Sequence, residues 1–440
     1  MNLALPTQKQ IEWQEMEVGM FIHYDIPVFA PGYDFRANPA VGVPSAELFN
    51  PTQLDTDQWI AAAVSIGAKY AVLTAKHCTG FCLWPTTAYP YSVKESPWKD
   101  GGGDVVADFV ASCRKYGIRP ALYCSFPANW YLRVDDPGVV LSGDPDEQRR
   151  YVKIYETITE ELWSKYGELV EIWFDGSAPP VSEGGPDLMP LLNRYQPDAV
   201  CFQGPKPSVR WVGNEDGWAR YPCWSTVSDK GRYGPDGDSG YAGNPDEAYW
   251  CGSEVDVTLI HREYNGGWMW SPGCEDHIYS LDHLIGVYYS SVGRNCNLLL
   301  NASPGPDGLI PDSHMRRYEE FGAEIERRFG RPLASTAGVG SEITLALPKS
   351  HTVVDHVILQ EDISGGHRIR EYVVESNAEY GWREIARGSA VGHKRIEYFP
   401  PIEATNLRVR VTQCVGTPIV SAFAAYDTGS GRSRGTASTA

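Results

Sequence analysis

Residues Asp104–Cys124 read DVVADFVASCRKYGIRPALYC and combine a helix pattern with a strand pattern. Asp104 follows three glycines and is a suitable N-cap for a helix that continues to Tyr116. The run from Arg119 to Cys124 is short and apolar, which is typical of a buried strand. Short apolar strands that alternate with helices imply a parallel sheet with helical crossovers, so this stretch predicts an α/β fold.

The same alternation extends over the first three quarters of the chain. Polar residues stand at the ends of several predicted strands, including His23, His77 and Asp175. A (β/α) barrel of the TIM type gathers such strand ends around one central site, whereas a doubly wound sheet, the alternative fold, spreads them along a line. No G-x-G-x-x-G or P-loop pattern supports nucleotide binding. The other predicted strands cover 19–23, 69–75, 169–175, 199–203 and 297–301, and the other predicted helices cover 57–66, 146–166, 188–195, 280–292 and 312–328.

The texture of the chain changes after Pro332. Seven short strand-like runs lie between residues 341 and 426, and turns rich in Gly, Pro, Asn and Asp separate them. This pattern predicts an antiparallel β-sandwich. We therefore expect a barrel domain over residues 1–335, a sandwich over 336–427 and a disordered Gly/Ser/Thr-rich tail over 428–440.

Composition describes a folded protein, with 42% hydrophobic and 21% charged residues. The net charge of −18 disfavours nucleic acid as a partner, because an acidic surface repels phosphates. No apolar stretch is long enough to span a bilayer, so we expect no membrane association. The 14 Trp and 25 Tyr have two equally good interpretations: a well-packed core, or a site in which aromatic rings stack on sugars. Nothing in the sequence indicates an oligomeric state.

The ten cysteines form no repeated C-x-x-C pair and no Cys/His spacing suited to zinc. Several lie inside apolar runs, and buried thiols of this kind favour a reducing compartment. The N-terminus shows no signal peptide, so a cytoplasmic location is expected. A secreted or periplasmic location stays open if a signal was removed. No metal ligand shell is evident around the strand-end His and Asp residues, so a metal site is not expected.

Asp175 ends the apolar strand 169–175 and is followed by Gly176. A carboxylate in this position, flanked by Trp173 and Phe174, is expected to be partly desolvated and directed into a pocket. The competing interpretation is that Asp175 only caps the next turn. The functional interpretation makes it the nucleophile of a retaining glycosidase.

Glu215 lies in the loop-like sequence 210–217, after the following strand. A retaining glycosidase needs a second carboxyl group about 5 Å from the first to protonate the leaving oxygen. Asp216 is an equal candidate on position alone, and both residues also fit an ordinary solvated loop. Arg210, in the same run, is expected either to bond a carboxylate or sugar hydroxyl or to lie on the surface.

His23 and His77 each end a strand, which favours a shared pocket over two separate structural histidines. Trp268 and Trp270 follow two glycines and form either a buried plug or a wall around a sugar ring.

Several ordered motifs resemble those of one known family. Over residues 8–425 the chain resembles glycoside hydrolase family 29, the retaining α-L-fucosidases, and it looks closest to the branch that acts on α-1,3/4-linked fucose. The run from Ala75 to Pro85, AKHCTGFCLWP, is the most distinctive. The other runs are Trp13–His23, Glu171–Gly176, Arg210–Glu215, Gly267–Trp270 and Ser291–Asn295.

The resemblance implies a (β/α) barrel followed by a β-sandwich, with Asp175 as nucleophile and Glu215 rather than Asp216 as acid/base. It implies an oligosaccharide substrate and neither metal nor organic cofactor. His23, His77 and Tyr123 match positions that contact the sugar. The further predicted sugar contacts are Tyr24, Cys78, Trp84, Trp173, Arg210, Trp268 and Trp270.

Three stretches depart from the family pattern. The chain has His-Tyr-Asp at 23–25 where members have His-Phe-Gly, and Lys-His-Cys-Thr-Gly-Phe at 76–81 where they have Lys-His-His-Asp-Gly-Phe. A Glu-Trp pair common between these runs is not evident in 31–35. The resemblance implies that these segments hold sugar hydroxyls, and an unmatched buried polar group costs about 1–3 kcal/mol.

The departures leave three alternatives to a plain α-L-fucosidase. The first is a shifted preference, for example toward L-galactose, on the same catalytic machinery. The second is a sugar-binding protein without activity. The third is an enzyme that transfers the sugar to another sugar instead of to water, which the sequence does not distinguish from a hydrolase.

Overall fold

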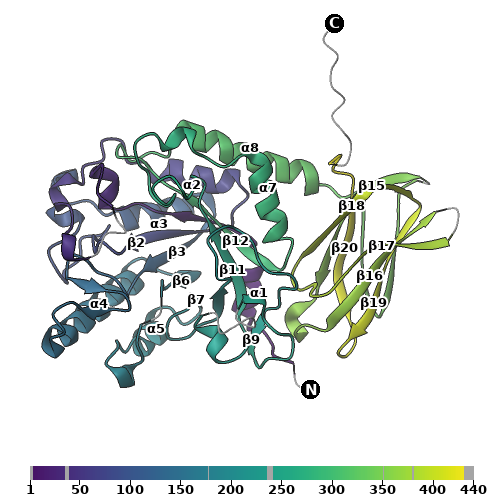
Figure 1. Ribbon diagram of the computed structural model, residues 1–440, viewed down its shortest axis with the longest axis horizontal. Coiled ribbons are helices and arrows are strands. Elements are labelled where there is room, and N and C mark those ends of the chain that lie inside the picture. Colours follow the sequence, from purple (N-terminus) through teal and green to yellow (C-terminus); the bar gives the residue numbers. More distant parts are fainter. Residues whose placement is uncertain are drawn as a thin grey trace, which may run out of the picture.

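A computed structural model describes residues 3–34, 39–176, 178–234, 241–349, 351–378 and 381–430. It consists of a barrel and a β-sandwich that lie side by side, with helix α8, Asp312–Phe329, leading from one to the other (Figure 1). The predicted fold class is confirmed: an α/β barrel of the TIM type is followed by antiparallel sheets.

The barrel is a closed sheet of eight parallel strands. Each strand pairs with its neighbour in parallel register, for example Val18 of the first strand with Leu298 of the last. The strands in order around the barrel are β1 (Val18–Ile22), β12 (Cys296–Ala302), β11 (Gly252–Val257), β8 (Val209–Trp211), β7 (Val200–Phe202), β6 (Glu171–Trp173), β3 (Arg119–Cys124) and β2 (Tyr70–Lys76).

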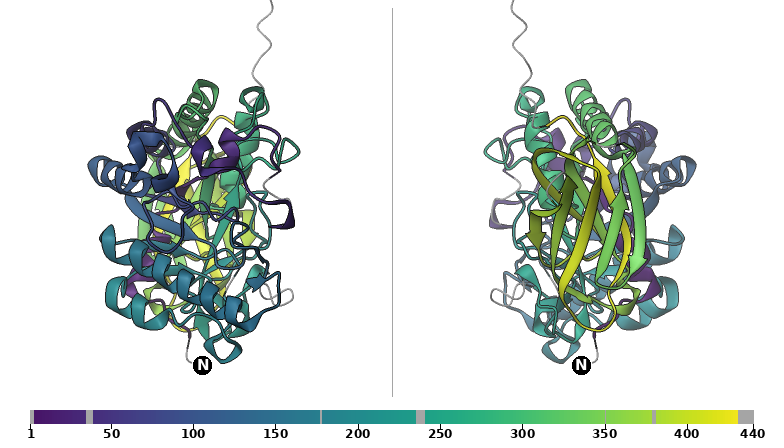
Figure 2. Two further views of the ribbon diagram at one scale, coloured as in Figure 1. Left: turned by 90° about the vertical axis from the view of Figure 1, so that its left-hand side faces the viewer. Right: turned by 90° about the vertical axis from the view of Figure 1, so that its right-hand side faces the viewer.

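Helices surround the barrel (Figure 2, left). Asp104 caps α3 as predicted, because its side chain accepts a hydrogen bond from the Ala107 amide at 2.8 Å. Gly117 ends that helix in the left-handed region, with a φ of 71°. The other helices between strands are α2 (Thr56–Ser65), α4 (Pro145–Lys165), α5 (Met189–Tyr195) and α7 (Leu281–Ser290).

The turn from β7 to β8 is made by residues 203–208 alone, without a helix. The N-terminal helix α1, Gln8–Gln14, lies against this part of the barrel. Gln10 Nε2 donates to the Ser208 carbonyl at 3.1 Å, and Trp13 Nε1 donates to Glu171 inside the barrel at 3.2 Å. Helix α1 therefore binds the base of the barrel where a crossover helix is missing.

Two barrel strands were not predicted. Arg210 was expected in a loop, but Val209–Trp211 pairs with both neighbouring strands as β8. Gly252–Val257 pairs as β11, although Glu254 and Asp256 interrupt its apolar pattern. Both carboxyl side chains are buried, so the polar residues that hid this strand belong to the barrel interior.

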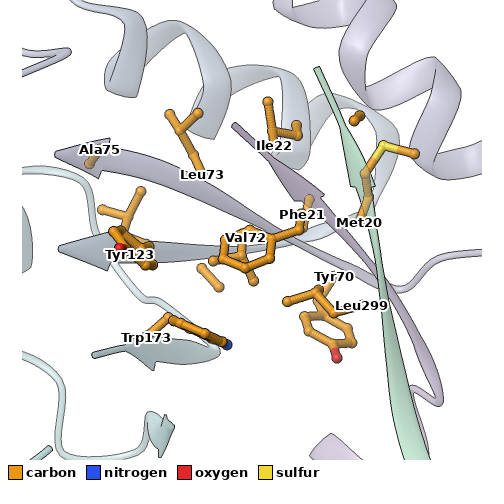
Figure 3. Packing of buried hydrophobic residues seen from close by; sticks show 14 of the residues in the cluster. Met20, Phe21, Ile22, Tyr70, Val72, Leu73, Ala75, Tyr123, Trp173 and Leu299 are labelled. Carbon is orange, nitrogen blue, oxygen red and sulfur yellow. The ribbon is translucent and has the colours of Figure 1, made fainter. Parts of the chain in front are cut away.

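Aromatic side chains fill the upper part of the barrel interior (Figure 3). Phe21, Tyr123 and Trp173 come from three different strands and point toward one another. The Trp173 ring lies 5.4 Å from Tyr123 and stacks on Phe202 at 3.8 Å, measured between ring centroids. This cluster closes the barrel below its open, carboxyl end.

The C-terminal part contains two four-stranded antiparallel sheets. An apolar core that includes Val354, Leu407 and Phe423 lies between them. One sheet has the order β13 (Ala334–Val339), β20 (Ile419–Tyr426), β15 (Thr352–Glu361) and β18 (Arg395–Ala404), and the other β14 (Glu342–Ala346), β19 (Asn406–Cys414), β16 (Ile369–Ala378) and β17 (Gly381–Gly388).

Two two-stranded sheets lie outside the sandwich, in the loops between barrel strands. They pair β4 (Val134–Asp135) with β5 (Val139–Val140) and β9 (Thr226–Val227) with β10 (Tyr249–Trp250).

The start of the predicted disordered tail is ordered. Thr428 is buried, and its amide donates to Asp355 Oδ1 at 2.8 Å. Arg327 of α8 donates to the Thr428 carbonyl at 2.9 Å, so residues 428–430 are tied to both domains. The rest of that prediction, residues 431–440, lies outside the described residues.

Barrel and sandwich are joined by polar contacts. Glu17, just before β1, accepts a hydrogen bond from His393 Nε2 at 2.9 Å and pairs with Lys394. The Asn295 side chain accepts from the His393 amide at 2.7 Å and donates to the Cys223 carbonyl at 3.0 Å. No helix in the described part of the chain has the length and apolar character needed to cross a bilayer.

Candidate active site

A cavity of about 780 Å³ opens at the carboxyl ends of the barrel strands. Asp175 and Glu215, which belong to different loops, both line it. A (β/α) barrel brings strand ends together in this way, and the size suits a small ligand. The other described residues that line the cavity are Phe21, His23, His77, Tyr123, Trp173, Gly176, Phe202, Gln203, Trp211, Asp216, Asp256, Arg262, Glu263, Trp268 and Tyr279.

Asp175 follows β6 and is exposed to the cavity. Tyr123 Oη donates a hydrogen bond to its Oδ2 at 2.9 Å. The next residue, Gly176, has a φ of 65° and donates its amide to Gln203 Oε1 at 2.9 Å, which fixes the turn. Protein surrounds the carboxylate on the sides away from the cavity. This burial raises the pKa of Asp175, the Tyr123 hydrogen bond opposes the rise, and nearby Glu215 adds to it.

Glu215 lies in the loop after β8 and is about one third exposed, at 34%. Arg262 Nη2 lies 2.6 Å from Glu215 Oε2, and the same guanidinium contacts Asp216 Oδ1 at 2.9 Å. Trp268 Nε1 donates to Glu215 Oε2 at 3.4 Å. Arg262 therefore holds both candidate carboxylates at the mouth of the cavity, and Trp268 contacts Glu215.

Asp256 is a further carboxyl group in the cavity, one that the sequence pattern did not reveal. It stands near the end of β11, is 5% exposed and accepts a hydrogen bond from Trp211 Nε1 at 2.9 Å. Burial and the nearby charge of Glu215 raise the pKa of Asp256 well above its usual range. The strand-end position was a usable signal, but the strand itself was not recognised.

His23 follows β1 and is fixed in one tautomer by Asn301. The Asn301 amide nitrogen donates to the Trp268 carbonyl at 2.8 Å, so the amide oxygen faces His23 Nδ1, 2.7 Å away, as an acceptor. Nδ1 must then carry the proton. Burial lowers the pKa of His23 to about 3, so the ring is neutral and Nε2 is an acceptor at the cavity.

His77 lies beside His23, with 5.6 Å between ring centroids. It stacks on Tyr123 at 5.6 Å, and its Nδ1 lies 3.1 Å from the Cys78 Sγ. Burial lowers the pKa of His77 well below its usual range, so this ring is also neutral. Cys78 contacts the back of His77 and is not among the residues that line the cavity.

Comparisons with known proteins bear on what this cavity does. The family model of alpha-L-fucosidase matches residues 10–328. The chain is similar to alpha-L-fucosidase 1 of Arabidopsis thaliana, with 31% identity over 99% of this chain and 90% of that protein. The chain belongs to the alpha-L-fucosidase family. It is accordingly a glycoside hydrolase, and the sequence resemblance to this family is confirmed.

Solved structures agree with this family membership. A Bacteroides thetaiotaomicron protein assigned as an alpha-L-fucosidase is 39% identical, with a TM-score of 0.90 over 97% of this chain and 99% of that one. A Ruminococcus gnavus fucosidase of glycoside hydrolase family 29, solved in complex with fucose, is 25% identical, with a TM-score of 0.81 over 96% and 95% of the two chains.

Two predicted sugar contacts in this fucosidase fold face away from the cavity because neighbouring side chains on a strand point to opposite sides. Tyr24, next to His23, is fully buried among Phe29, Phe49 and Trp59. Arg210, next to Trp211, is 1% exposed and donates to the Trp224 carbonyl at 2.8 Å. Tyr24 packs the core, and Arg210 supports the outer loops of the barrel.

Two predicted tryptophan contacts are also not among the residues that line the cavity. Trp84 is fully buried and donates Nε1 to Glu161 of α4 at 2.8 Å. Trp270 donates Nε1 to Glu275 at 3.0 Å, and of the two neighbours Trp268 is the one that lines the cavity.

Among the residues that the structure describes, no three His, Cys, Asp or Glu side chains gather to hold a metal ion.

Proposed function

We propose that this family member is a retaining, exo-acting α-L-fucosidase that uses Asp175 as nucleophile and Glu215 as acid/base. The observation that carries the proposal is that both carboxyl groups line one cavity, with one Asp175 oxygen held by Tyr123. Phe21 and Trp173 close the bottom of that cavity, so it accepts the end of a sugar chain.

In the first step, the free oxygen of Asp175 attacks the anomeric carbon of the terminal sugar. Glu215 donates its proton to the glycosidic oxygen, and the C–O bond to the leaving group breaks. The product is a covalent ester with inverted configuration. In the second step, Glu215 removes a proton from water, which attacks the same carbon and releases Asp175. Two inversions give net retention.

The residues that hold the glycone offer a hydrogen-bond acceptor and apolar aromatic faces. His23 presents an acceptor for a sugar hydroxyl, and its neutral ring does not repel the developing positive charge at the anomeric carbon. Phe21, Trp173 and Trp268 supply apolar faces for the C–H surface and the methyl group of fucose. The fucose complex of the Ruminococcus gnavus relative supports this choice of sugar.

The positions of the altered motif residues do not support a shift from fucose to L-galactose. Tyr24 packs in the core, the Thr79 hydroxyl lies 2.7 and 2.9 Å from the two carboxyl oxygens of Asp25, and Cys78 lies behind His77. None of the three lines the cavity. We therefore propose that they compensate one another within the wall and leave the glycone preference unchanged. Hydrolysis of nitrophenyl α-L-galactoside at a higher kcat/KM than the fucoside would reverse this conclusion.

The linkage preference is proposed from the mouth of the cavity. Arg262, Glu263 and Tyr279 line it beyond Glu215, where the second sugar of the substrate must lie. This polar rim suits an N-acetylglucosamine that carries fucose in α-1,3 or α-1,4 linkage, as in the branch that the motifs resemble. The linkage preference is tested by comparing fucose release from trisaccharides that carry fucose in α-1,3 or α-1,4 linkage on N-acetylglucosamine with release from α-1,2-linked fucosyllactose. Faster release from the fucosyllactose would contradict the proposal.

Azide trapping separates the two catalytic roles. With Asp175→Ala, azide replaces the nucleophile and should give β-fucosyl azide, of inverted configuration. With Glu215→Ala and a reactive aryl fucoside, azide attacks the covalent intermediate and should give the α-azide. Proton NMR of the products distinguishes the two anomers. The assignment fails if Asp175→Ala keeps near-normal turnover or if Glu215→Ala yields no α-azide.

A further inference from the structure

Two glutamates with no assigned role lie inside the barrel beneath the catalytic cavity. Glu171 begins β6 and Glu254 lies in β11, and both side chains are fully buried. They come from strands that are not neighbours in the sheet, so they meet across the barrel interior. Their carboxyl groups are within hydrogen-bonding reach of each other.

The hydrogen bonds around this pair are incomplete without a proton. Glu254 accepts from Tyr70 Oη and, at 2.8 Å, from Trp173 Nε1. Glu171 Oε2 accepts from Trp13 Nε1 at 3.2 Å, but its Oε1 is buried without a donor. Two ionised carboxylates can only accept. A hydrogen bond between them therefore requires that one of them carries a proton, and Glu171 Oε1 is the position left for it.

The charges around the pair also indicate that one of the two glutamates carries a proton. The titratable groups that face it are Tyr70 of β2, Cys201 of β7, Cys296 of β12 and Asp256, two residues along β11. All of them are neutral or acidic, and no cation in the described part of the chain pairs with either glutamate. Two adjacent buried carboxylates without a cation cannot both be ionised. Burial raises the pKa values of both Glu254 and Glu171 above their usual range, and the closeness of Glu254 adds to the rise for Glu171.

We infer that Glu171 and Glu254 share one proton and act together as a positioning pair that holds the indole of Trp173 at the floor of the sugar-binding cavity. Tyr70 and Trp173 both point into the barrel interior (Figure 3). Both side chains donate hydrogen bonds to Glu254. Trp173 in turn stacks beside Tyr123, which binds Asp175. The pair thus supports the sugar site from below, and its role in sugar binding rests on the proposed function.

The shared proton is tested by stability and infrared spectra of the full chain. Because both pKa values are raised, the folded state binds more protons than the unfolded state above pH 4.5, and stability falls as pH rises. Glu171→Gln keeps a donor toward Glu254 but cannot titrate. Its melting temperature should fall less steeply between pH 6 and pH 9 than that of the unaltered protein, and the protonated-carboxyl band should weaken in the infrared difference spectrum.

Glu161→Gln is the matched control. Glu161 is also buried, but its hydrogen bonds with Thr87, Thr86 and Trp84 outweigh burial and lower its pKa. Replacing it should lower the melting temperature by a similar amount at pH 6 and pH 9. An unchanged slope in Glu171→Gln, or no loss of the infrared band, would overturn the shared proton. Neither measurement needs enzymatic activity.

The positioning role is tested by kinetics with an activated aryl α-L-fucoside. Glu254→Leu removes the acceptor for Trp173 and should raise KM about tenfold with a smaller change in kcat. Glu254→Gln and Glu171→Gln each keep an acceptor for this indole and should stay within about threefold of the original KM at pH 6. Equal KM values for the Leu and Gln variants at position 254 would overturn the role. If the unaltered protein hydrolyses no α-L-fucoside, the proposed function fails while the stability and infrared results still decide the proton.

Discussion

Tyr123 Oη and Asp175 Oδ2 are joined by a hydrogen bond of 2.9 Å between neighbouring barrel strands β3 and β6. The bond occupies one carboxylate oxygen and leaves the other for attack on the sugar. It also favours the ionised form, which is the nucleophilic one. A single tyrosine therefore sets both the orientation and the charge of the proposed nucleophile.

Replacing Tyr123 with Phe should lower kcat/KM about 10- to 100-fold, because a hydrogen bond to a charged group contributes about 1.5–3 kcal/mol. The Tyr123 bond lowers the pKa of Asp175, so its loss raises that pKa further. Asp175 must be ionised to attack, and the acidic limb of the pH profile should move to higher pH. The profile of kcat/KM between pH 4 and pH 8 measures the shift.

Tyr166→Phe is the control for this prediction, since Tyr166 donates to Asp104 at the same distance of 2.9 Å, far from the cavity. It should leave the acidic limb in place. An acidic limb that stays unmoved in Tyr123→Phe would show that Asp175 is not the group whose ionisation it reports.

Asp256→Asn and Glu215→Gln together distinguish the roles of two other carboxyl groups in the cavity. Burial and the nearby Glu215 raise the pKa of Asp256 and so favour its neutral form, for which an amide is a close substitute; the variant should keep activity within about threefold at pH 6. Glu215→Gln removes the proton donor and should lose at least about 100-fold on substrates with poor leaving groups. The reverse pattern would assign the acid/base role to Asp256.

Arg262→Ala should reduce kcat about tenfold, because Arg262 fixes Glu215 through a 2.6 Å contact while also holding Asp216. Added guanidinium should restore part of the loss. Arg387→Ala, which breaks an exposed pair with Glu384 in the sandwich, is the control and should leave kcat unchanged. Undiminished kcat in Arg262→Ala would remove the arginine from the positioning of the acid/base.

Glu17→Gln should weaken the junction of barrel and sandwich. Burial opposes ionisation of Glu17, but Lys394 and His393 outweigh it and lower the pKa from 4.5 to about 2. The stabilisation is therefore present above pH 4.5 and is lost as pH falls through about 2. Urea unfolding at pH 7 should show a loss of about 2–3 kcal/mol, which shrinks toward pH 3. A loss that is equal at both pH values would exclude the charge as its cause.

Most of the predicted site residues that line the cavity lie at the ends of strands. His23, His77 and Asp175 were placed on one cavity because each closes an apolar run, and a barrel brings such ends together. Two wrong sugar contacts, Tyr24 and Arg210, share one physical cause. Adjacent residues such as His23 and Tyr24 were assigned to the same pocket, although strand geometry sends their side chains to opposite faces.

The unpredicted parts of the site depend on contacts that are distant in sequence. Strand β11 was missed because its inward residues Glu254 and Asp256 are carboxyls, which an apolar strand pattern excludes. Their burial is stable only beside partners such as Trp173, Tyr70 and Trp211 from other strands. The residue pattern of one segment does not reveal hydrogen bonds from other strands that stabilise its buried carboxyl groups.

Helix α1 leaves the ribosome before any strand of the barrel, yet its partners are made much later. Trp13 bonds to Glu171, 158 residues onward, and Gln10 bonds to the Trp250 carbonyl, 240 residues onward. During synthesis the helix has nothing to pack against until most of the barrel has emerged. The base of the barrel is therefore closed late by a helix that is made before any of the barrel strands. A bulky fusion just ahead of Gln8 would delay that final closure more than it would disturb the finished protein.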